Sequence, residues 1–169
     1  MSIHGNTLDA ILELLIHEHG MDVALMVPDF RIGNACLVSA DGTQNALFID
    51  PMLIGDKFDQ KIFHMSLSKL DKLVQRYREK IKFIFWCLYG REQLNKQKGK
   101  YVYEKEVYRH PVWNYSELLD RYKENVIDIS DLGEKIIEIT EPDGTIHPIP
   151  AGYEYLTSKI KEELNLAIS

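Results

Sequence analysis

The sequence predicts an α+β fold in a single globular domain over residues 1–169, with a mainly antiparallel sheet built from hairpins and about four helices packed on it. Three observations predict this class. An Asp-Gly pair at 41–42 lies between two apolar runs, which signals a hairpin. Residues 66–82 carry apolar side chains at helical spacing, and hairpin-like stretches alternate with single helices along the chain.

The first predicted helix covers residues 6–20 and ends at Gly20. Its apolar side chains fall at i, i+3, i+4 and i+7, the spacing of a half-buried helix: Leu8, Ile11, Leu12 and Leu15. A strand-rich stretch follows, with an apolar run at 23–27 and a hairpin of 35–39 with 45–49. A short strand is expected at 61–65.

The middle of the chain predicts a long helix over 66–82, followed by a central strand at 83–88, where the residues are aromatic and β-branched. Residues 90–100 are polar and lie between two glycines, which predicts a loop. Residues 101–108 then predict a strand that returns alongside 83–88.

The last third predicts a helix from about Asn114 to Glu124, with an approximate capping box at its start. Strands are expected at 126–129 and 135–140, with an edge segment at 145–150 whose two prolines donate no hydrogen bond. A final helix covers about 153–166.

Composition and cysteine usage indicate a folded cytoplasmic protein. Apolar residues make up 45% of the chain, and no run of them is long enough for a membrane span. Cys36 and Cys87 lie in apolar runs, which favours buried thiols over a disulfide. The formal net charge is −6, so the chain is acidic as a whole.

Charge is distributed unevenly along the chain. The central segment 69–110 holds twelve Lys and Arg against five Asp and Glu, whereas both flanks are acidic. The cations expected on one helix face and the following loop are Lys69, Lys72, Arg76, Lys80, Arg91, Lys96, Lys98 and Lys100.

Three interpretations of this pattern stay open. The cations and interleaved tyrosines match a phosphate-binding face of a nucleic-acid-binding protein. They also match surface ion pairs between the basic segment and the acidic flanks, each of small value. The third interpretation is a bipolar surface that steers and selects protein partners.

Reactive motifs are missing from the sequence. His17 and His19 stand two apart on a helix and so face different ways, and the other histidines are isolated, which predicts no metal site. No catalytic residue and no cofactor are predicted. A metal-dependent nuclease is the enzymatic alternative, with Asp50, Glu104 and Lys105 as its parts.

Two local resemblances occur near the start of the chain. A helix ending at Gly20, followed by short strands that include residues 35–43 (Ala-Cys-Leu-Val-Ser-Ala-Asp-Gly-Thr), resembles the layout of type III secretion chaperones, a likeness that implies no function. Residues 4–8 (His-Gly-Asn-Thr-Leu), followed by Ile11 and Leu12, are similar to the first helix of very small bacterial helical domains suspected of binding DNA.

The function that we expect is non-enzymatic binding of another protein, as an inhibitor, immunity, anti-defence or adaptor protein. A nucleic-acid-handling enzyme is one such partner, nucleic acid itself is the alternative, no membrane is involved, and a homodimer is compatible with the sequence. The residues expected to contact a protein partner are Tyr101, Tyr103, Tyr108, Trp113, Glu134, Glu138, Glu141 and Asp143.

Overall fold

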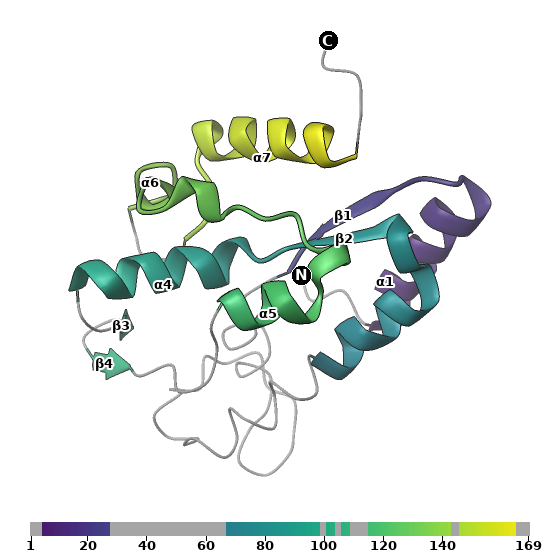
Figure 1. Ribbon diagram of the computed structural model, residues 1–169, viewed down its shortest axis with the longest axis horizontal. Coiled ribbons are helices and arrows are strands. Elements are labelled where there is room, and N and C mark those ends of the chain that lie inside the picture. Colours follow the sequence, from purple (N-terminus) through teal and green to yellow (C-terminus); the bar gives the residue numbers. More distant parts are fainter. Residues whose placement is uncertain are drawn as a thin grey trace.

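The computed structural model in Figure 1 describes residues 5–27, 67–98, 101–103, 106–108, 115–142 and 146–164. Most of these residues are helical. The labelled elements are α1 (Gly5–Leu12), the π-helix η1 (Glu13–Glu18), β1 (Val23–Met26), the 3-10 helix η2 (Arg78–Lys80), β2 (Ile81–Ile84), α4 (Trp86–Lys98), β3 (Tyr101–Tyr103), β4 (Glu106–Tyr108), α5 (Tyr115–Arg121), the 3-10 helices η3 (Lys123–Asn125) and η4 (Ser130–Leu132), α6 (Lys135–Glu138) and α7 (Pro150–Glu163). A further helix covers residues 67–77.

The predicted fold class is wrong, because the central sheet is small and parallel. β1 pairs with β2 in parallel, from Val23 opposite Ile81 to Met26 opposite Ile84. Val126 adds an isolated parallel bridge to Phe83 on β2. Parallel neighbours need a long crossover, and the helix 67–77 delivers β2 alongside β1 in this way. The predicted hairpin around the Asp-Gly pair at 41–42 lies outside the described residues.

Two predicted strands are helical over part of their length. The segment 83–88 contributes to β2, but α4 begins at Trp86 and continues through the expected loop at 90–100. Its aromatic residues favour a strand, yet a helix places Trp86 and Tyr89 on one side, and both are buried. The predicted strand at 135–140 contains α6 in the structure. Tertiary packing therefore decides both segments against local preference.

The expected return strand at 101–108 consists of two short strands that pair with each other. β3 and β4 are antiparallel, with Tyr101 opposite Tyr108. Other predictions are confirmed with altered bounds. β1 lies within 23–27, the central helix ends at residue 77, and α5 and α7 occupy the places expected for the last two helices.

The core is centred on β2 and the residues that follow it. In Figure 1, α6 and α7 lie on one side of the β1–β2 pair and α5 lies on the other. The Phe83 and Tyr122 rings meet edge to face, with centroids 5.5 Å apart, and Phe85 lies 6.3 Å from Tyr122. This aromatic packing joins the sheet to the end of α5, and Trp86 is fully buried beside it.

A buried hydrogen bond and a strained residue fix the connection to α7. The Trp86 indole Nε1 donates to the Ile146 carbonyl oxygen at 2.9 Å. Ile146 is buried at a φ of 61°, a left-handed conformation that is unfavourable for a β-branched side chain. A side chain at Gly90 would collide with Ile146, so close approach requires glycine there.

The side chain of Asn125 ties the third parallel segment to the start of β2. Its Nδ2 donates to the Arg78 carbonyl at 2.7 Å and to the Ile81 carbonyl at 2.9 Å. Arg78 has a φ of 49°, so the chain turns sharply where the helix 67–77 ends. Among the described residues, no helix is both long and apolar enough to cross a lipid bilayer.

Candidate functional site

The largest polar network among the described residues lies where parallel strands end. The Ile127 N–H donates to the Phe83 carbonyl at 2.9 Å, and Asp128 follows directly. Asp128 therefore leaves the sheet at the same edge as β2, whose chain continues into α4. The carboxyl ends of parallel strands are where open α/β sheets most often bind ligands, which makes this edge the first place to look for chemistry.

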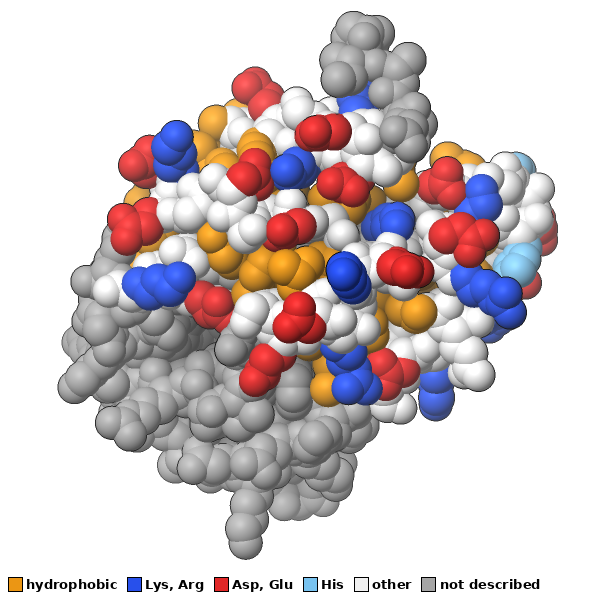
Figure 2. Space-filling model, viewed as in Figure 1, with side chains coloured by type: hydrophobic (Ala, Val, Ile, Leu, Met, Phe, Trp, Pro, Cys, Tyr) orange, Lys and Arg blue, Asp and Glu red, His pale blue; other side chains and the backbone are white. Residues whose placement is uncertain are grey.

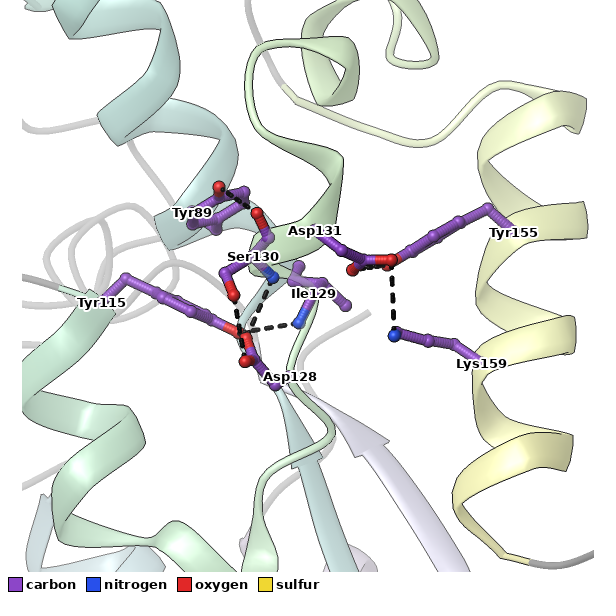
Figure 3. A network of polar contacts seen from close by, with 8 residues as sticks. All are labelled: Tyr89, Tyr115, Asp128, Ile129, Ser130, Asp131, Tyr155 and Lys159. Atoms are coloured by element: carbon purple, nitrogen blue, oxygen red, sulfur yellow. Dashed lines mark hydrogen bonds and ion pairs between the residues drawn. The ribbon is translucent and has the colours of Figure 1, made fainter.

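Asp128 is held by α5 and by the residue two positions further along the chain (Figure 3). Its Oδ1 accepts from the Tyr115 hydroxyl at 2.9 Å and from the Ser130 N–H at 2.9 Å, and its Oδ2 accepts from the Ser130 Oγ at 2.9 Å. The Tyr115 hydroxyl in turn accepts from the Ile129 N–H at 3.0 Å. Both carboxylate oxygens and the phenol are thus used within the network.

Two more tyrosines close the network from α4 and α7. The Tyr89 hydroxyl donates to the Ser130 carbonyl at 3.0 Å. The Tyr155 hydroxyl donates to Asp131 Oδ1 at 2.6 Å, and the Lys159 ammonium lies 3.4 Å from Asp131 Oδ2. Figure 3 shows these side chains converging on residues 128–131 from three helices.

Glu92 supplies a cap between helices. The N–H of Tyr115, the first residue of α5, donates to Glu92 Oε1 on α4. Burial raises the pKa of the Glu92 carboxyl above its usual value, although this hydrogen bond acts in the opposite direction. A helix begins with N–H groups that have no partner within the helix, so a carboxylate from a neighbouring helix satisfies one of them.

The protonation states of the tyrosines and of Asp131 in this network fit a structural role. Burial raises the pKa values of Tyr89, Tyr115 and Tyr155 above the ordinary value, so these phenols stay protonated and act as hydrogen-bond donors. Partial burial alone would raise the pKa of Asp131, but the Tyr155 hydrogen bond and the Lys159 charge together lower it. A neutral phenol is neither a strong base nor a nucleophile, so this chemistry fixes α4, α5 and α7 around residues 128–131.

The basic residues that the sequence singled out do not form one free face. Lys69, Lys72 and Arg76 are exposed on the helix 67–77, but Lys80 lies beyond its end, in η2. Arg76 lies 2.6 Å from Glu13 and Lys80 lies 3.1 Å from Asp22, so acidic residues of the N-terminal flank pair with two of the four cations. This geometry favours the interpretation as surface ion pairs for those two residues.

The cations predicted in the loop are on α4 or beyond it. Lys96 is exposed on α4, which also carries the backbones of Arg91 and Lys98. Lys100 lies outside the described residues. Lys69 and Lys72 are exposed and make no ion pair to a described residue.

The residues predicted to contact a protein partner lie in separate parts of the chain, and two of them are outside the described residues. Glu134, Glu138 and Glu141 are exposed, on or next to α6. The backbones of Tyr101, Tyr103 and Tyr108 lie in the β3–β4 hairpin. Trp113 and Asp143 lie outside the described residues, as do the proposed nuclease residues Asp50, Glu104 and Lys105. The described residues contain no group of three or more metal-ligating side chains.

Sequence reasoning missed the tyrosine–aspartate network. One signal was present, because Asp128 and Ser130 are spaced as in an Asx turn, where an aspartate accepts from the N–H two residues later. No spacing rule could link Tyr89, Tyr115 and Tyr155, which come from three separate helices. Comparisons with protein-family models, curated proteins and solved structures find no match to this chain.

Proposed function

We propose that this protein acts by binding a basic surface of another protein, through the exposed side of α6 and α7. We call this surface the Tyr153 face and define it by Tyr153, Glu134, Glu138, Glu141 and Glu154. The observation that carries the proposal is the exposure of Tyr153, which is 55%, higher than that of any other large apolar side chain described. Tyrosine is among the residues that dominate binding energy at protein interfaces.

Backbone pairing brings the two helices of the Tyr153 face together. The Ile149 N–H donates to the Ile139 carbonyl at 3.1 Å, and the Glu141 N–H donates to the His147 carbonyl at 2.8 Å. These bonds hold the end of α6 beside the start of α7, and Tyr153 follows one turn later. An aromatic anchor thus lies on the same unit as Glu138 and Glu141.

The charge of this region selects a basic partner. In Figure 2, the part of the surface formed by α6 and α7 shows more acidic than basic side chains. Lys159 already contacts Asp131, which reduces the positive charge available there. Opposite potentials raise association rates and exclude partners of like charge. The interior polar network supports a non-enzymatic role, since its donors and acceptors serve one another.

The test compares wild-type protein with a Tyr153→Ala, Glu138→Lys double variant as bait in a cell lysate. We expect a stoichiometric protein on the wild-type bait at low salt, and its loss from the variant. A Lys69→Glu, Lys72→Glu bait is the matched control, because it changes exposed charge on another surface, and it should keep the same protein.

Three outcomes would contradict the proposal. The first is that the wild-type bait captures no stoichiometric protein at low salt. The second is that the wild-type bait and the Tyr153→Ala, Glu138→Lys bait capture the same protein equally well. The third is capture of DNA or RNA that depends on Lys69 and Lys72, which would support the nucleic-acid alternative instead.

A further inference from the structure

β1 ends the N-terminal unit (residues 5–27) and lies at the edge of the small parallel sheet. In the described part of the chain, β2 is its one strand neighbour, because Val126 bridges to the opposite side of β2. The four residues of β1, Val23–Met26, include neither a charged residue nor a proline. Natural proteins often place such residues on edge strands, where they prevent pairing with another chain. The sequence of β1 therefore leaves this edge open to pairing.

The backbone of β1 has a defined outer side. The Val27 N–H donates to the Ile84 carbonyl at 2.9 Å, so the backbone groups of Val27 face β2. Successive residues of a strand direct their N–H and C=O groups to alternate sides, which puts those of Ala24 and Met26 on the outer side. None of these four groups makes a hydrogen bond to a described residue. The Met26 side chain is also 36% exposed, so solvent reaches this end of the strand.

We propose that the outer side of β1 binds β1 of a second copy of this chain, antiparallel about a twofold axis at Leu25. An extended backbone presents donors and acceptors at the spacing that such an edge requires. When Leu25 lies opposite Leu25 of the second copy, Ala24 lies opposite Met26. Each Ala24–Met26 pair exchanges two hydrogen bonds, so the outward groups of both strands all find partners. Mixed sheets with an antiparallel strand beside parallel ones are common.

The sizes of the side chains support this register. The small Ala24 lies opposite the long Met26 on one face of the sheet, and Leu25 meets its own copy on the other face. Leu25 is half-buried against the core, so pairing would cover the part that is still exposed. A shift by two residues would instead place two alanines opposite each other and Met26 beside the charged Asp22.

Charge does not oppose the pairing. Asp22, which directly precedes β1, lies 3.1 Å from Lys80 and is neutralised by it. In the proposed register, the Asp22 residues of the two copies lie at opposite ends of the strand pair, so like charges do not meet. Four hydrogen bonds over a four-residue strand predict a weak dimer that forms at high protein concentration. This edge is separate from the Tyr153 face, and the two proposals are independent.

Sedimentation velocity of the full chain over a range of protein concentrations measures the dimer. We expect wild type to change from monomer to dimer as the concentration rises. Met26→Lys should weaken the dimer at least ~tenfold, because a charged side chain at a strand edge opposes pairing. Met21→Lys is the matched control, since Met21 is 50% exposed but lies outside β1, and it should dimerise like wild type. Circular dichroism checks that both variants fold.

Disulfide cross-linking tests the register, with wild type as the background for the native thiols of Cys36 and Cys87. At the proposed axis, the thiols of Leu25→Cys face each other within reach of a disulfide, so oxidation should give a covalent dimer. Ala24→Cys is the control. Its two thiols are offset by two residues along the strands, which is too far for a disulfide, so it should stay at the wild-type background.

The proposal is overturned if wild type stays monomeric at every concentration, or if Met26→Lys and Met21→Lys dimerise equally well. It is also overturned if Ala24→Cys cross-links and Leu25→Cys does not. A dimer that is lost from Tyr153→Ala and kept by Met26→Lys would overturn it by placing the second copy on the Tyr153 face. Each of these results leaves the lysate experiment on the Tyr153 face unaffected, and failure of that experiment leaves the dimer unaffected.

Discussion

Two regions of this protein use polar side chains in opposite ways. Around Asp128, tyrosines from α4 and α5 donate to a carbonyl and a carboxylate, and Tyr89 and Tyr115 are almost completely buried. Between the N-terminal unit and the helix 67–77, Arg76 and Glu13 form an ion pair 2.6 Å long, and both side chains are substantially exposed. The first region joins elements far apart in the sequence, and the second neutralises charge on the surface.

The most conspicuous feature of the sequence, its uneven charge, is therefore not what holds the fold together. Exposed ion pairs contribute ~0–1 kcal/mol each, because solvent screens both charges and the side chains lose freedom. A buried donor that loses its acceptor costs ~1–3 kcal/mol. The charge map therefore says much about partners and little about stability. Three substitutions test this difference, from the largest expected effect to the smallest.

The largest effect is expected for Tyr115→Phe. The substitution removes one hydroxyl and leaves the buried Ile129 N–H without its acceptor, so the free energy of unfolding should fall by ~2 kcal/mol. Urea unfolding followed by circular dichroism measures the change. Tyr153→Phe is the matched control, because its hydroxyl makes no hydrogen bond to a described residue, and it should stay within ~0.5 kcal/mol of wild type. Equal losses in the two variants would refute the structural role of the network.

A smaller, pH-dependent effect is expected for Asp131→Asn at the exposed margin of the network. The folded-state pKa of Asp131 is lowered below 3.8, so its ionised form stabilises the folded state above that pH. This stabilisation disappears as the pH falls through the lowered pKa. Because Asp131 is more than half exposed, we expect a loss of only a few tenths of a kcal/mol at neutral pH.

Thermal unfolding at pH 7 and near pH 2 measures the pH dependence. The difference between wild type and Asp131→Asn should shrink as the pH falls, because the wild-type carboxyl becomes protonated as the pH passes through its lowered pKa. A difference that grows on acidification would show that Asp131 does not act through its charge.

The smallest effect is expected for Arg76→Gln in the exposed region. The ion pair to Glu13 is lost, but water solvates both groups, so the free energy of unfolding should change by less than ~0.5 kcal/mol. Any loss should become smaller in ~1 M salt, where the Debye length falls to ~3 Å. Chemical denaturation at two salt concentrations measures this change. A loss of unfolding free energy as large as that of Tyr115→Phe would show that the exposed ion pair stabilises the fold as much as the buried network does.

The sequence predicted individual elements better than their arrangement. The periodicity of the helix 67–77 and of α7 comes from packing one side of a helix, which is local and readable. The run 83–88 was predicted as a strand throughout because aromatic residues such as Phe85 and Trp86 have strand propensity. The burial that decides their conformation depends on segments elsewhere in the chain. The parallel pairing of β1 with β2 left no signal in either strand.

For the candidate surfaces, too, the sequence indicated some features and only the structure showed others. Glu134, Glu138 and Glu141 are exposed in the structure, and their contact with a partner stays a prediction. The pairing of Arg76 and Lys80 with Glu13 and Asp22 was one of the open interpretations, and geometry supports it. Ile11 was expected to pack inward, whereas the structure leaves its side chain 41% exposed.

By itself, the sequence determined the helical segments with regular apolar spacing, the acidic flanks around a basic centre, and the lack of a recognisable catalytic motif. Tertiary structure alone decided that β1 and β2 run in parallel, that Trp86 begins a helix, and that three tyrosines meet residues 128–131. The physical reason is range. Periodicity and charge are properties of neighbouring residues, whereas strand partners and buried hydrogen bonds join groups tens of positions apart, and their energy exists only once the chain has folded.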